Sequence, residues 1–288
     1  MRSHFRPESV GKSNMRSHFI SSAAIACAVT GATAMMTEVS SAQIAADFAT
    51  DPVYAGGWTA GLNGGYGFGA WSFTGTGGGS GQEMSSASSI GTAWTMFNTS
   101  SSSGISDTGR AISEAGGLQA GQTFEAVIQN PTTYHFYRGW DVGFLNATDN
   151  NLGGNNSASL FLNVFNYNYP SYNGVVPNWS VTDNGGGTTS TISPGTSAAV
   201  KIDLMLTSAT TYSLTLTPLG GGSPYTQSGT LAGPINYVNF RSYNGVSAGP
   251  SDVANNYGIS YMEIVPEPAT LALVGLGFGG VLFLRRRK

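Results

Sequence analysis

The chain has 288 residues and few charges, since Asp, Glu, Lys and Arg make up only 9% of it, against about 25% in a typical soluble domain. Between residues 43 and 264 it carries twelve acidic and four basic residues, a net charge of −8. Such a segment offers no surface that tracks phosphates, which argues against nucleic-acid binding. Gly, Ser, Thr, Asn and Tyr replace charge as the polar surface, as is typical of a secreted, strand-rich protein.

The amino end has the pattern of a secretory signal peptide. Arg16 precedes a moderately apolar stretch at residues 19–36, and small residues then lead to Ala42 and Gln43. This order predicts a leader over residues 1–42, cut between Ala42 and Gln43, and therefore an exported mature chain.

Two further features of the leader bear on the mature protein. The pentapeptide MRSHF occurs at residues 1–5 and again at 15–19, so the start is either Met1 or Met15. Cys27, the only cysteine, lies inside the apolar stretch. The mature chain is therefore expected to have no disulfide and no Cys-based metal site.

The body shows apolar residues that alternate with polar ones at residues 124–128, 134–144, 200–206 and 212–216. Residues 159–169 are apolar on both faces at first, as in a central or bulged strand, and residues 257–264 are expected to form a last strand. This period of two predicts strands, and the runs on either side of residues 208–210 predict a β-hairpin. Stretches rich in Gly and Asn supply the turns between them. We expect one all-β domain over residues 43–264, an antiparallel β-sandwich of the jelly-roll kind.

The body offers few groups for catalysis. Its only histidine, His135, lies in a strand-like run and is interpreted as structural, and a site with several histidine ligands is excluded. Glycoside hydrolysis needs only two carboxylates, for which the candidates are Glu83, Glu114, Glu125, Glu263 and Asp141. We therefore expect no enzyme, with a polysaccharide-active hydrolase or lyase as the alternative.

Aromatic residues gather in a glycine-rich stretch between Asp51 and Trp71. Exposed rings stack on sugar faces while neighbouring polar groups bond the hydroxyls. This predicts glycan contacts by Trp58, Tyr66 and Trp71. The other interpretation, which is preferred for any single ring, is that it belongs to the core of the sandwich.

Two loops contain oxygen ligands of the kind that bind Ca²⁺. The sequence DNNLGG begins at Asp149, and DNGGG begins at Asp183. Neither has the carboxylate count of an established calcium loop. Turns built on Asn and Gly are the preferred interpretation, and we expect no cofactor.

The carboxyl end combines three features in a fixed order. Val265 is followed by Pro266-Glu267-Pro268, then by an apolar run at residues 269–284, and finally by four cations: Arg285, Arg286, Arg287 and Lys288. These 24 residues resemble the PEP-CTERM sorting signal of Gram-negative bacteria. The resemblance implies export, membrane insertion of residues 269–284, and processing near Pro266-Glu267-Pro268 by an exosortase. It also implies a link to exopolysaccharide.

Elementary physics is consistent with this assignment. Sixteen residues make a helix of roughly 24 Å, which spans a core of about 30 Å only if the bilayer thins or the arginines snorkel. The terminal cations stay in the cytoplasm, so the body faces outward. Two prolines prevent a regular ladder, which predicts an extended and accessible stretch for the processing enzyme.

The body itself resembles a group of uncharacterised secreted bacterial β-proteins, which is similar to concanavalin-like jelly rolls. The stretch from Asp51 to Trp71 and the sequence GQTFEAVIQNP carry this resemblance, which implies a fold but no activity. We expect a protein of the cell surface or extracellular matrix that is structural or associates with carbohydrate. A homopolymerising matrix protein is a further class.

Overall fold

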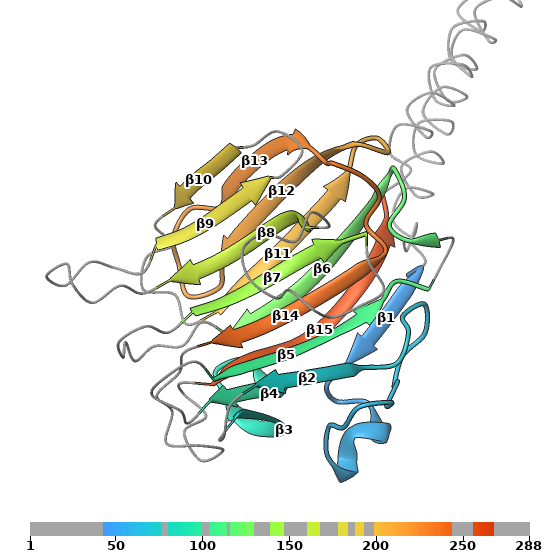
Figure 1. Ribbon diagram of the computed structural model, residues 1–288, viewed down its shortest axis with the longest axis vertical. Coiled ribbons are helices and arrows are strands. Elements are labelled where there is room, and N and C mark those ends of the chain that lie inside the picture. The colour runs from blue at the N-terminus through green and yellow to red at the C-terminus, as the bar shows by residue number, and fades with distance from the viewer. Residues whose placement is uncertain are drawn as a thin grey trace, which may run out of the picture. The chain divides into compact units, whose positions relative to one another are not determined.

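The computed structural model describes residues 43–76, 80–98, 104–113, 116–129, 139–146, 160–167, 178–183, 188–192, 199–243 and 256–267. These residues form antiparallel strands and one short 3-10 helix, η1 (Pro52–Gly56). The strands form two sheets that lie one over the other (Figure 1). The prediction of an antiparallel β-sandwich is confirmed.

The eight-stranded sheet contains the carboxyl-terminal strand near its middle. Its order is β13 (Tyr225–Thr230), β12 (Thr211–Pro218), β11 (Ala199–Leu206), β6 (Gln122–Gln129), β15 (Tyr257–Pro266), β4 (Gly91–Asn98) and β3 (Ser80–Ser88), with β1 (Ala45–Phe48) also pairing with β15. A register shift between Ile259 and Tyr261 marks a bulge in β15. On one edge of β15, β4 pairs before this bulge and β1 pairs after it.

The seven-stranded sheet completes the sandwich. Its order is β10 (Thr188–Ile192), β9 (Asn178–Asp183), β8 (Leu160–Tyr167), β7 (Gly139–Leu145), β14 (Tyr237–Tyr243), β5 (Ile105–Ala111) and β2 (Ser72–Thr76). Side chains from both sheets form one buried core cluster.

The predicted hairpin is confirmed as β11 and β12, with Ile202 opposite Leu216 and Leu204 opposite Leu214. These residues are buried and their neighbours in sequence are half-buried, as the period of two requires. The predicted last strand is also confirmed, but it runs to Pro266 instead of ending at Ile264.

The chain passes from one sheet to the other between β1 and β2. Tyr66 pairs with Ala46 of β1 through two backbone hydrogen bonds of 3.0 Å. Two residues later, Phe68 forms a bridge with Ile112, which directly follows β5. This crossing closes one edge of the sandwich.

Glycine is required in the crossing segment because the backbone lies directly against β1. A Cβ atom at Gly65 would lie 1.8 Å from the carbonyl oxygen of Ala46. Gly67 has a φ of 74°, a conformation that side chains other than glycine rarely adopt. The run of glycines therefore reflects close packing of backbones.

A buried ion pair joins the two sheets at this edge. Arg110 of β5 and Asp47 of β1 form a salt bridge in which both side chains are 0% exposed. The Arg110 guanidinium lies 4.6 Å from the ring centroid of Trp71 and 5.1 Å from that of Phe68. Its Nε donates to the carbonyl oxygen of Gly69 at 2.9 Å.

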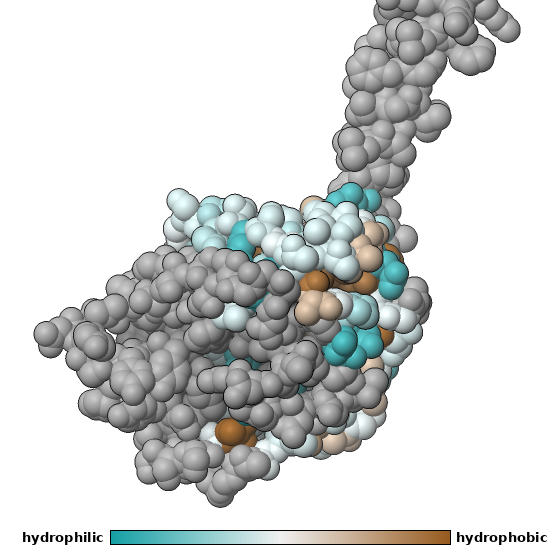
Figure 2. Space-filling view, turned by 45° about the horizontal axis from the view of Figure 1, so that its top comes forward, coloured by the Kyte–Doolittle hydropathy of each residue, from teal (hydrophilic) through white to brown (hydrophobic). Residues whose placement is uncertain are grey.

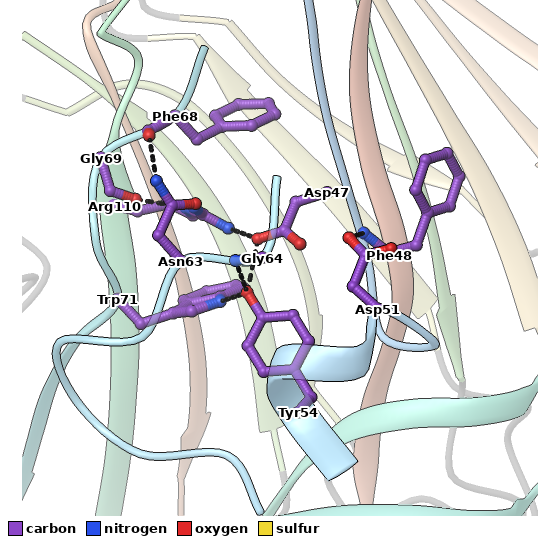
Figure 3. Close-up of polar contacts among 10 residues, drawn as sticks. All are labelled: Asp47, Phe48, Asp51, Tyr54, Asn63, Gly64, Phe68, Gly69, Trp71 and Arg110. Carbon is purple, nitrogen blue, oxygen red and sulfur yellow. Dashed lines mark hydrogen bonds and ion pairs between the residues drawn. The ribbon is translucent and has the colours of Figure 1, made fainter. Parts of the chain in front are cut away.

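Tyr54 of η1 completes this polar cluster (Figure 3). Its hydroxyl donates to Asp47 at 2.6 Å and accepts from the Gly64 N–H at 2.9 Å and from the Trp71 indole N–H at 3.0 Å. Burial raises the pKa of Tyr54 to about 12, so the hydroxyl keeps its proton. Burial also raises the pKa of Asp47, and the neighbouring Arg110 counteracts this rise. The cluster ties η1 and the crossing segment to both sheets.

We predict that Arg110→Met lowers the free energy of unfolding by about 3–5 kcal/mol, because it leaves Asp47 buried without its cation. Lys201→Met is the matched control, since Lys201 is a half-exposed cation on β11 and its loss is expected to cost no more than about 1 kcal/mol. Denaturant unfolding followed by tryptophan fluorescence measures both. Equal losses for the two variants would contradict the importance assigned to the buried pair.

Candidate processing site at the end of the last strand

The predicted processing motif begins inside the sandwich. Val265 pairs with Thr123 and Pro266 pairs with Gln122 of β6. The Glu267 N–H then donates to the carbonyl oxygen of Gly121 at 2.7 Å. The first residues of the motif therefore continue β15 along β6.

The expectation that proline keeps this stretch out of a ladder is wrong for Pro266. Hydrogen-bonded positions alternate along an antiparallel pair. Because the Glu267 N–H bonds to Gly121, Pro266 opposite Gln122 is a non-hydrogen-bonded position, and its missing N–H takes no bond from the pairing with β6. Pro266 is half-buried and Glu267 is exposed.

The rest of the tail lies outside the described residues, including Pro268, the predicted span 269–284, and the cations Arg285, Arg286, Arg287 and Lys288. The predicted leader 1–42, with Ala42, also lies outside them. Within the described ranges, no helix is long and apolar enough to cross a membrane.

The predicted amino end of the mature chain lies beside the same strand. The Ile44 N–H donates to the carbonyl oxygen of Ile264 at 2.8 Å. The Gln43 side-chain amide donates to the Glu263 carboxylate, and the Tyr66 hydroxyl donates to the carbonyl oxygen of Gln43 at 3.3 Å. The two predicted processing points therefore border adjacent strands of one sheet.

Two of the three aromatic residues predicted to contact a glycan belong to the core. Trp58 is 3% exposed and Trp71 is 2% exposed. Their rings meet edge to face at 5.0 Å, and Trp71 makes a similar contact with Trp94 at 5.0 Å. The prediction is wrong for these two because the crossing segment turns both rings inward, whereas Tyr66 is 50% exposed.

An aromatic pair that the sequence did not single out lies on the outer face of the eight-stranded sheet. Phe48 and Tyr261, opposite each other in β1 and β15, are both half-buried, and their rings stack at 5.9 Å with an interplanar angle of 29°. In the neighbouring row, Glu263, Glu125 and Asp203 face one another across three strands. Lys201 binds Glu125 at 2.5 Å and Asp203 at 2.8 Å.

The described part of the face drawn in Figure 2 is weakly polar. Figure 2 shows it mostly pale, neither strongly hydrophilic nor strongly hydrophobic, with separated teal and brown patches. This agrees with the alternation of half-buried and exposed Ser, Thr and Gln along β13.

A second polar row lies on the seven-stranded sheet. Arg241 of β14 is opposite Asp107 of β5 on one side and Asp141 of β7 on the other. These side chains point away from the core, since Val238 and Phe240 of the same strand belong to it. The Arg241 Nε lies 3.4 Å from a carboxylate oxygen of Asp107.

Burial is the largest influence on the pKa values of the two carboxyl groups in this row. It raises the pKa of Asp107 to about 6 and that of Asp141 to about 7, although Arg241 opposes both shifts. The charge of Asp107 adds to the rise at Asp141. Oδ1 of Asp141 is buried and has no hydrogen-bond partner in the part of the chain that the structure describes.

The carboxylates proposed for hydrolysis do not all converge. Glu125 and Glu263 lie opposite each other on β6 and β15, whereas Asp141 belongs to the other sheet. Glu83 lies on β3, where it accepts a hydrogen bond from the Asn256 amide at 3.3 Å.

Three further features bear on catalysis: the carboxylate of Glu114, the histidine His135, and a Gly-Val-Ser-Ala-Gly sequence at residues 245–249. This sequence has the Gly-x-Ser-x-Gly pattern of a nucleophile elbow. All three lie outside the described residues.

Asp183, one of the two candidate calcium ligands, faces the opposite sheet. Its Oδ2 accepts a hydrogen bond from the Thr230 N–H at 3.0 Å. A Cβ atom at Gly229 would lie 2.2 Å from this oxygen. Asp183 therefore joins β9 to β13, while Asp149 lies outside the described residues. No cluster of three metal-ligating side chains occurs in the described ranges.

Comparison with known families identifies the tail. Residues 265–288 match the family described as the PEP-CTERM protein-sorting motif. The motif implies an exported protein that an exosortase processes. No curated protein sequence matches the chain.

Solved structures with a similar fold include lectin-like domains. The legume lectin-like domain of Entamoeba histolytica is 9% identical, with coverage of 69% of this chain and 90% of that chain and a TM-score of 0.41. The exoplasmic/lumenal domain of VIP36, solved with Ca²⁺ and Man3GlcNAc, is 12% identical, with coverage of 69% and 84% and a TM-score of 0.45. Lectin I-B4 of Griffonia simplicifolia, in a metal-free form, is 12% identical, with coverage of 69% and 93% and a TM-score of 0.35. At this level the likeness carries no argument about a ligand.

We predict that the free energy of unfolding falls as the pH rises from about 4 to about 7. The pKa values of Asp107 and Asp141 are raised in the folded state, to about 6 and about 7, above about 3.9 in the unfolded chain. The folded protein therefore binds more protons in this window, and stability is lost as these carboxyl groups ionise.

Asp141→Asn is expected to reduce this pH dependence, whereas Glu267→Gln, which removes an exposed carboxylate, leaves it unchanged. Urea unfolding across the same pH window measures all three proteins. Parallel curves for the wild type and Asp141→Asn would contradict the assignment.

Proposed function

We propose that the protein is an exported, exosortase-processed component of the cell surface or extracellular matrix that associates with carbohydrate, and that it works alongside exopolysaccharide. The single observation that carries the proposal is the match of residues 265–288 to the sorting motif. In this proposal the carboxyl-terminal tail is the sorting signal that directs the export and processing of the β-sandwich domain.

The outer face of the eight-stranded sheet is the proposed carbohydrate-contacting surface. The stacked rings of Phe48 and Tyr261 are half-buried, so each keeps an exposed part that can cover the apolar face of a sugar. The carboxylates of Glu263 and Glu125, with the ammonium of Lys201, lie in reach of these rings and can bond hydroxyl groups. This surface replaces Trp58 and Trp71 as the candidate site.

We predict that the mature exported protein lacks its carboxyl-terminal tail. Mass spectrometry of the intact protein from cells with an exosortase should give the mass of a chain that ends near Pro266-Glu267-Pro268 and lacks the residues from there to Lys288. The double variant Glu267→Ala and Pro268→Ala should keep the tail, because the recognised motif is lost, while Glu263→Ala, outside the motif, should be processed normally. A wild-type protein that retains Lys288 after export would contradict the proposal.

We predict that Tyr261→Ala weakens binding to a polysaccharide ligand about tenfold, because it removes the ring on which the sugar stacks. Binding to a glycan array followed by titration of the best ligand measures this loss. Phe97→Ala, in β4 of the same sheet, serves as the matched control and should bind as the wild type does. An equal loss in both variants would place the ligand elsewhere.

A polysaccharide-active hydrolase is the second candidate. The observation that favours it is the placement of Glu125 and Glu263, which face each other on adjacent strands. Cβ atoms of such pairs lie about 4.5–5.5 Å apart, and retaining glycosidases hold their two carboxyl groups at about 5–5.5 Å. Burial also raises the pKa of Glu263, as a general acid requires.

Release of new reducing ends from a polysaccharide panel distinguishes the two candidates. Hydrolysis that Glu263→Gln abolishes would favour the enzyme. Binding without product release would favour the carbohydrate-associating protein.

A further inference from the structure

We propose that the folded sandwich restricts access to its own sorting motif, so that residues 265–267 must leave strand β6 before the exosortase can process the tail. This inference rests on the proposed function and concerns its regulation. It arises from an overlap: the matched motif begins at Val265, whereas β15 ends at Pro266. No spacer separates the body from the motif.

The backbone of the shared residues is engaged on the side of β6. Val265 and Pro266 are in register with Thr123 and Gln122, and the Glu267 N–H bonds to Gly121. An enzyme that takes a peptide in extended form pairs with the same backbone groups. Those groups cannot serve β6 and the enzyme together.

The opposite edge of β15 is restricted too. The Ile44 N–H bonds to the carbonyl oxygen of Ile264, and the Gln43 side chain bonds to Glu263. These contacts lie directly before the motif. They fix the strand up to Ile264, which is 1% exposed.

Opening of the last three residues is local. Pro266 has no N–H to give up, Val265 and Pro266 are half-buried, and Glu267 is exposed. Strand ends of this kind open without unfolding of the sheet. Ile264 is the point at which opening stops, because it belongs to the core cluster.

Gly121 holds the end of the motif in place. Its carbonyl oxygen accepts from Glu267, and its own N–H donates to the carbonyl oxygen of Leu206 at 2.7 Å. Its φ is 77°, and the space where a Cβ would stand is empty. A residue with a side chain is therefore strained here by its backbone alone, and relief of this strain displaces the carbonyl oxygen.

The test compares rates of tail processing in full-length variants. A Gly-Ser-Gly-Ser spacer inserted between Ile264 and Val265 moves the motif out of the sheet. Gly121→Ala loosens the contact with Glu267. Gly91→Ala is the matched control, because Gly91 has a φ of 84° with open space around it and is the first residue of β4, away from the motif.

Pulse-labelling in cells that hold an exosortase, with intact mass as the readout, gives each rate. We expect the spacer variant to be processed severalfold faster than the wild type. Gly121→Ala should be about fivefold faster, and Gly91→Ala should match the wild type. Amide exchange of Glu267, measured on the purified precursor, should be faster in Gly121→Ala than in Gly91→Ala.

Three outcomes would overturn the proposal, and they are distinguishable. Equal rates in all variants would mean that the enzyme takes the motif from the paired strand, while the proposed function stands. Faster processing of both glycine variants would assign the effect to general stability. Failure of every variant, including the one with the spacer, would overturn the proposed function itself.

Discussion

The sandwich depends on a buried charge that links its two sheets. Arg110 and Asp47 come from strands of different sheets, and both are fully removed from water. Two isolated charges at such depth would be very costly, so the surrounding groups have to compensate. The Tyr54 hydroxyl donates to Asp47, while the side-chain oxygen of Asn63 and the backbone carbonyl oxygen of Gly69 accept hydrogen bonds from Arg110. Trp71 faces the guanidinium. Each of these partners requires the segment after β1 to return across the edge of the sandwich.

This requirement explains the glycine-rich stretch between residues 51 and 71. Backbone has to lie against β1, and Gly65 has no space for a side chain. Close packing of the backbones fixes the positions of the glycines. The side chain of each aromatic residue between them then points either inward to the core or outward to solvent. Trp58 and Trp71 point inward and Tyr66 outward. Composition alone does not separate these directions, which is why the sequence suggested glycan contacts for two rings that belong to the core.

The sequence predicted those elements in which one face is apolar and the other polar. Strands β11 and β12 have this pattern over their whole length, and the structure confirms both with their register. Strand β5 could not be found in this way, because Ser106, Thr108 and Arg110 occupy its inward face. Their burial depends on partners from distant segments, such as Gln82 for Ser106. Those partners exist only after the sheets have met.

For the sorting motif, the local sequence predicts the identity but not the position in the fold. Its identity could be predicted from residues 265–288 alone, because an ordered set of local features defines it. Its relation to the body could not, because Pro266 indicates the end of a strand without showing which strand lies beside it. The pairing with Gln122 joins residues that are far apart in the chain. The same holds for the outer-face pair Phe48 and Tyr261, which the sequence separates by most of the body.

Strand β15 connects the centre of the eight-stranded sheet to the sorting motif. It is the last strand of the body, yet it lies inside its sheet, between β6 on one edge and β4 and β1 on the other. Ala45, near the start of the described chain, pairs with Ile264, near its end. Contacts of such sequence separation form late, because the intervening chain must first be ordered. The centre of the eight-stranded sheet therefore cannot close until the residues that lead into the sorting motif have been synthesised. Completion of the fold and placement of the motif at the edge of the sheet are one event, since the same strand performs both.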